Sequence, residues 1–185
     1  IISISSCTDK FEDFNTDKKN PASVAGEALI SNAQKNLVDQ MSTPNVNRNI
    51  TEIWAQYWNE TTYTDEANYD IVEQIFRYLY RDVLMDLAEG SRLISEEEPF
   101  DADAAIVKEN KLQIIEILNV FVFQRLVDIF GAVPYSAALD IGNVYPVYEM
   151  GDDIYSDLIS RLDAAVAALD PSYGSYGSAD LIYNG

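Results

Sequence analysis

Carboxylates dominate the side chains of this chain that could do chemistry, because 31 of its 185 residues are Asp or Glu while none is histidine. Histidine is the commonest general base and metal ligand of proteins. Without it, these residues cannot build a Ser-His-Asp triad, a Cys-His pair or a zinc site with histidine ligands. Only carboxylate, lysine or tyrosine chemistry stays open.

The acidic excess also bears on metal ions and partners. Segment 13–17, Asp-Phe-Asn-Thr-Asp, begins like a calcium loop, but Lys18 stands where that loop needs Gly and Val24 where it needs Glu, so an EF-hand is rejected. Structural calcium elsewhere stays open with no identifiable ligands, and no cofactor or metal site is predicted. The formal net charge of −19 repels phosphate backbones, so nucleic acid is not an expected partner.

The single cysteine, Cys7, follows Ile4-Ser5-Ser6, which has the pattern of a lipobox. In a lipobox a signal peptide is cut before the cysteine, whose thiol is then acylated; the alternative is a lone buried cysteine. The lipobox interpretation makes 1–6 the end of a lipoprotein signal peptide and 7–19 a lipid-anchored tether, with the helical domain in 20–185. Membrane attachment would be through the lipid only, since no apolar run approaches the roughly 20 residues of a spanning helix.

Apolar residues at helical spacing predict five helices and no convincing sheet. We expect the helices at about 20–41, from about 51, at about 69–93, at about 101–130 and at about 152–169. Capping residues mark three of the starts, namely Asn20 with Pro21 behind it, Asp101 or Asp103, and Asp152. The pattern therefore predicts a mainly α protein.

The fourth predicted helix is the most apolar. Its segment 120–123, Val-Phe-Val-Phe, could by local preference form a strand, but the continuous pattern is too long for one. We interpret it as a buried central helix that Gly131 ends. With irregular segments at 132–150 and 172–185, the expected architecture is helical hairpins stacked as in solenoid repeats, with long irregular loops and a truncated C-terminus.

Three segments resemble the SusD/RagB family of nutrient-binding outer-membrane lipoproteins. They are 126–139 with Phe-Gly-Ala-Val-Pro-Tyr-Ser-Ala-Ala-Leu at its end, 146–169, and 54–69 with Trp-Ala-Gln-Tyr-Trp-Asn-Glu at its start. The last points to the SusD-like, starch-binding-associated branch. Departures from the family pattern at Ala132 and Ala137 concern local loop contacts, and the chain is similar to an N-terminal fragment of the longer family members.

The resemblance implies a tetratricopeptide-like helical scaffold and a surface lipoprotein of the outer membrane. Such a protein captures oligo- or polysaccharide, or in some members peptide, and passes it to a SusC-like TonB-dependent transporter on which it sits as a lid. No catalysis is implied, so the protein is not expected to be an enzyme.

A glycan platform needs exposed aromatic rings flanked by polar side chains, because a sugar has an apolar C–H face and a rim of hydroxyls. Segment 57–69 offers these. We expect Trp58, Tyr63 and Tyr69 to stack on sugar rings and Asn68 to hydrogen-bond hydroxyls. Aromatic residues at helical spacing are more often core, and Trp54 and Tyr57 are assigned there.

The irregular 132–150 segment is long for a connection inside a compact domain, and long loops tend to be functional. Tyr135 and Pro146 are its candidate transporter contacts. One alternative is a peptide-binding or purely protein-binding helical-repeat accessory, which predicts transporter binding without glycan affinity. A glycoside hydrolase is less favoured: two carboxylates about 5 to 10 Å apart would suffice, but no motif marks such a pair.

Overall fold

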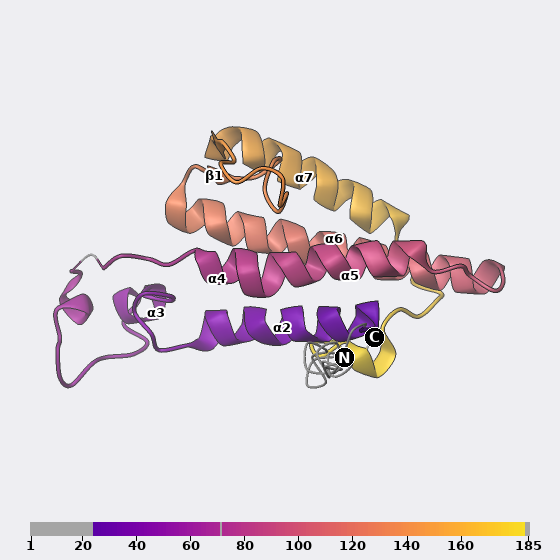
Figure 1. The fold of residues 1–185 in the computed structure, drawn as a ribbon. Helices are drawn as coiled ribbons and strands as arrows, with labels where there is room; N and C mark the ends of the chain where they lie inside the picture. The colour runs from indigo at the N-terminus through magenta and orange to yellow at the C-terminus, as the bar shows by residue number, and fades with distance from the viewer. Residues whose placement is uncertain (1–23, 71, 184–185) are drawn as a thin grey trace, which may run out of the picture.

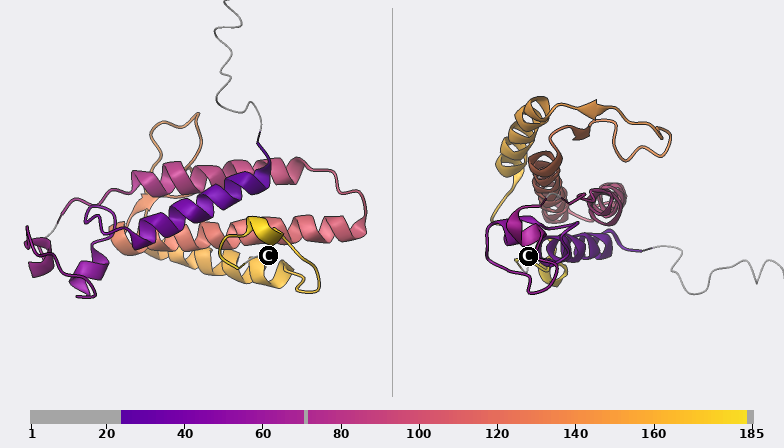
Figure 2. Two further views of the ribbon diagram at one scale, coloured as in Figure 1. Left: turned by 90° about the horizontal axis from the view of Figure 1, so that it is seen from below. Right: turned by 90° about the vertical axis from the view of Figure 1, so that its left-hand side faces the viewer.

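The computed structural model describes residues 24–70 and 72–183, which form a stack of helices (Figure 1). The long ones are α2 (Gly26–Ser42), α5 (Met85–Glu96), α6 (Ala102–Phe130) and α7 (Gly151–Ala168). Helix α2 packs on α5, α5 on α6, and α6 on α7, and the end-on view in Figure 2 shows them as a staggered column. The predicted mainly α class is confirmed.

Two glycines allow α2 and α5 to approach closely. A Cβ atom at Gly90 would lie 2.6 Å from Ile30 Cδ1, and one at Gly26 would lie 2.7 Å from Ile94 Cγ1. Helix α2 begins at Gly26, because Ala25 is already extended with ψ of 144°. It therefore starts later than predicted; the proposed caps Asn20 and Pro21 lie outside the described residues.

The helix predicted from Tyr69 begins only at Arg77. It runs as α4 (Arg77–Leu79), a π-helical turn η2 (Tyr80–Leu84) and then α5. The delay has a tertiary cause, because the segment before it pairs with the chain after α2. Ile75 N–H donates to Asn47 O at 2.8 Å, and Asn47 Nδ2 donates to the carbonyl of Glu73 at 2.9 Å.

The second predicted helix is also shorter than its aromatic spacing suggests. Helix α3 (Thr51–Trp54) has four residues, and Gln56 adopts a left-handed φ of 59° that ends it. Tyr57 is consequently exposed, so its assignment to the core was wrong. Trp54 is partly buried.

Helix α6 forms as predicted. The Asp101 side chain accepts a hydrogen bond from Ala104 N–H at 2.7 Å, and the helix ends at Gly131 with φ of +75°, as capping chemistry requires. Segment 120–123 is helical, and Val122 is fully buried. Among the described residues, no helix is long and apolar enough to cross a membrane.

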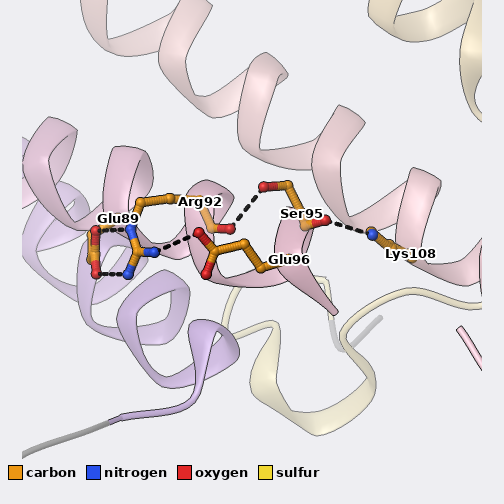
Figure 3. A network of polar contacts seen from close by, with 5 residues as sticks. All are labelled: Glu89, Arg92, Ser95, Glu96 and Lys108. Carbon is orange, nitrogen blue, oxygen red and sulfur yellow. Dashed lines mark hydrogen bonds and ion pairs between the residues drawn. The ribbon is translucent and has the colours of Figure 1, made fainter. Parts of the chain in front are cut away.

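The C-terminal end of α5 is tied to α6 by one lysine (Figure 3). Lys108 Nζ donates to the carbonyl of Ser95 at 2.7 Å. It also donates to the carbonyl of Glu97, again at 2.7 Å. These carbonyls have no partner inside the helix, so a lysine here satisfies them and complements the helix dipole. On the exposed side of the same turn, Arg92 pairs with Glu89 and Glu96.

The 132–150 segment contains a minimal sheet that the sequence did not predict. Strand β1 (Val133–Pro134) pairs antiparallel with β2 (Tyr148–Glu149). Helix α7 then begins at Gly151 with extended Met150 at its N-cap, so Asp152 lies in the first turn instead of at the cap.

The segment after α7 crosses to α2 and contains a short 3₁₀ turn, η3 (Gly177–Ala179). Asn110 of α6 holds its first turn: Asn110 Oδ1 accepts from Asp170 N–H at 2.9 Å and Nδ2 donates to the Asp170 carbonyl at 2.9 Å. Tyr176 is buried, and its hydroxyl donates to the carbonyl of Lys111. The segment is thus held against α6 before η3 contacts α2.

Candidate functional site

The predicted platform lies in the loop that follows α3 and on the turn η1 (Glu66–Asn68), at one end of the helical stack (Figure 1). Trp58 is 56% exposed, Tyr63 84% and Tyr69 57%. Tyr63 and Tyr69 both have left-handed φ, at 58° and 69°. Such backbone is uncommon for residues other than glycine and clusters at functional sites.

A hollow of about 550 Å³ opens beside Trp58. It brings together two of the four predicted residues, Trp58 and Asn68, whereas Tyr63 and Tyr69 lie outside its lining. The full lining is Ile53, Gln56, Trp58, Asn59, Thr64, Ala67 and Asn68. An indole beside amides and a hydroxyl is the composition that a sugar ring with hydroxyl groups needs.

Hydrogen bonds fix the polar groups around this hollow. Asn68 Nδ2 donates to the carbonyl of Thr64 at 2.8 Å. Gln56 Nε2 donates to the Tyr69 hydroxyl at 3.3 Å. Tyr69 therefore contributes to the site by orienting Gln56, one of the lining residues.

A second, smaller hollow of about 130 Å³ also has Trp58 and Asn59 in its lining. It includes Glu60, whose Oε2 atom is buried and has no hydrogen-bond partner among the described residues. Buried polar atoms nearly always have a partner, so this oxygen is an exception beside Trp58. Asn59 and Glu60 were not predicted as site residues, although they directly follow Trp58.

Tyr135 is not placed as a partner contact would require. It is 9% exposed, its ring packs edge-on against Phe123 with centroids 4.8 Å apart, and its hydroxyl accepts from Arg161 Nη1 at 2.5 Å. Its hydroxyl also bonds to Asp157, and burial raises the pKa of Tyr135 to about 12. The expectation of a direct contact through Tyr135 is therefore corrected: its ring fixes the loop base.

Pro146 lies in the part of the loop that projects from the stack. We call the exposed apolar residues of this part the loop patch; it consists of Ile141, Val144, Tyr145, Val147, Tyr148 and Met150. The base below it is held by Glu149, whose Oε1 accepts from Ser136 N–H at 2.6 Å and from its hydroxyl at 2.8 Å. Exposed apolar patches mark contact surfaces, and Pro146, itself partly buried, sits among these residues.

Ion pairs lower the pKa of three carboxyl groups. Lys111 lowers the pKa of Glu27, Arg81 that of Asp82, and Arg92 that of Glu89. Within 24–70 and 72–183, no three Cys, Asp or Glu side chains lie where they could share a metal ion.

Comparison with curated proteins gives no match. A family model does match residues 18–185, which is most of the chain; the family is SusD-like and is described as starch-binding and associating with the outer membrane. The match includes the platform and the loop patch, while Cys7 lies before it and outside the described residues. Because this match covers most of the chain, the protein belongs to the SusD-like family.

Proposed function

We propose that the protein captures oligo- or polysaccharide at the cell surface and passes it to a SusC-like TonB-dependent transporter, held to the outer membrane by lipid on Cys7. The observation that carries the glycan role is Trp58, which is exposed and lines both hollows. Gln56, Asn59 and Asn68 line the larger hollow beside the indole and supply polar groups for sugar hydroxyls.

The transporter contact is assigned to the loop patch, with Pro146 among its residues. The patch projects from a base where Tyr135 and Glu149 form hydrogen bonds. Exposed apolar side chains that are covered when a partner docks contribute to binding. The platform and the loop patch share no residues, so glycan and transporter binding can be tested separately.

Affinity electrophoresis through gels that contain different polysaccharides tests the glycan role. We expect one glycan class to retard the protein and Trp58→Ala to weaken retardation about tenfold, because covering part of an indole ring contributes about 1.5 kcal/mol. Tyr145→Ala removes an even more exposed aromatic residue, from the loop patch, and should leave retardation unchanged.

The same two variants should have the opposite effects on recovery of the transporter complex. Tyr145→Ala is expected to reduce co-purification of the transporter, whereas Trp58→Ala should not. If no glycan retards the protein but the transporter is still recovered, a peptide ligand or a purely protein-binding accessory role replaces glycan capture. Unchanged retardation by Trp58→Ala would place the glycan site elsewhere.

A further inference from the structure

The stretch of chain that carries the platform is acidic throughout. Between Arg48 and Arg77 the sequence has no lysine or arginine. The acidic residues of this stretch are Glu52, Glu60, Asp65, Glu66, Asp70 and Glu73. Six acids without a base give residues 49–76 a formal charge of −6 at pH 7.

Four of these carboxylates lie next to the two hollows beside Trp58. Glu52 and Glu60 belong to the lining of the smaller hollow. Asp65 and Glu66 stand in the turn between residues that line the larger one. None of the four forms an ion pair with a residue of 24–70 or 72–183. Their negative charge is therefore not offset within the described part of the chain.

The nearest arginines along the chain pack on Tyr78 of α4. The guanidinium carbons of Arg48 and Arg77 lie 3.8 and 5.1 Å from the centre of the Tyr78 ring, and Arg77 Nη2 donates to the Tyr78 hydroxyl at 3.3 Å. Among the described residues, no lysine or arginine belongs to the lining of either hollow beside Trp58. A ligand there meets amides, a hydroxyl and carboxylates, without a cation.

We propose that these carboxylates make the platform selective for glycans without uronate or sulfate groups. An acidic sugar stacked on Trp58 would bring its charge close to the carboxylates of Glu52 and Glu60, and no cation would offset the repulsion. The Debye length is about 8 Å at physiological ionic strength, so neighbouring charges are only partly screened. The inference rests on the proposed glycan-binding function and narrows its class of ligand.

Affinity electrophoresis with matched pairs of polysaccharides tests this selectivity. The probes are amylose, xyloglucan and galactomannan, each beside the same polymer with C6 hydroxyls oxidised to carboxylates, and Trp58→Ala is the reference in every gel. We expect a dissociation constant about tenfold higher for the oxidised member, and a smaller ratio as salt is added. Asp65→Asn/Glu66→Gln should lower the ratio about threefold, because it removes two of the four neighbouring carboxylates. Asp152→Asn/Asp153→Asn, which removes two exposed acids from α7, is the matched control and should leave the ratio unchanged.

The outcomes separate this selectivity from glycan capture itself. Equal binding of neutral and oxidised members overturns the selectivity and leaves glycan capture intact. A ratio that the platform double variant does not change assigns the discrimination to the shape of the polymer, and a ratio that the α7 double variant lowers equally assigns it to the charge of the whole protein. Either result also overturns the selectivity. If no polysaccharide retards the wild type more than Trp58→Ala, the proposed function itself fails.

Discussion

Replacing Asn110 by alanine should detach the segment after α7 from α6. Asn110 is 3% exposed; its Oδ1 accepts from Asp170 N–H at 2.9 Å, and its Nδ2 lies 2.9 to 3.3 Å from the carbonyls of Asp170, Tyr173 and Gly174. One acceptor and two N–H groups amount to three hydrogen bonds, each contributing about 1 kcal/mol. Alanine returns about 0.6 kcal/mol of helix propensity, so we expect a loss of about 2 to 3 kcal/mol.

Urea unfolding followed by circular dichroism measures this loss. Asn32→Ala is the matched control, because Asn32 is an exposed helical asparagine with one side-chain hydrogen bond, to Asp86; it should change the free energy of unfolding by less than about 0.5 kcal/mol. If Asn110→Ala costs no more than this control, the hydrogen bonds do not hold the segment and the reasoning is refuted.

Three further changes have defined outcomes. Gly90→Ala should cost about 1 to 3 kcal/mol in urea unfolding, since its Cβ would lie 2.6 Å from a side-chain carbon of α2; Gly174→Ala, with nothing within 4 Å, should be neutral. Tyr78 should titrate near pH 8, because hydrogen bonds from its arginine neighbours lower its pKa, and Arg77→Gln should move the tyrosinate absorbance change to higher pH. The pKa of Glu27 is lowered below 4.5 by its lysine partner, so its stabilising effect, present at neutral pH, should disappear on acidification through the folded-state pKa; equal melting temperatures of wild type and Glu27→Gln at pH 7 would contradict this.

Local signals were sufficient for some elements. Helix α6 could be predicted from Asp101 to Gly131, because an N-cap carboxylate, an uninterrupted helical spacing and a glycine with positive φ all act within a few residues. The start of α7 was misplaced by two residues, since Asp152 is a good cap in isolation and equally favourable in the first turn.

The platform region shows where local signals failed. The spacing of Trp54, Tyr57 and Trp58 favours a helix, yet α3 ends at Trp54. The helical run of α4, η2 and α5 begins only at Arg77. The cause lies 26 to 28 residues away, where the segment before Arg77 bonds to the chain after α2. No pattern within one helix length carries that information, so the exposure of Tyr57 could not be read from the sequence.

The sequence by itself determined the mainly helical class, the family and the aromatic segment that carries Trp58, because these depend on composition, periodicity and short motifs. Only the tertiary structure decided that Tyr135 is buried and that Gln40, Arg48, Gln74 and Arg125 line one hollow. These residues come from four separate segments. Their proximity follows from helix packing, which depends on the shapes of distant side chains and leaves no local trace in the sequence.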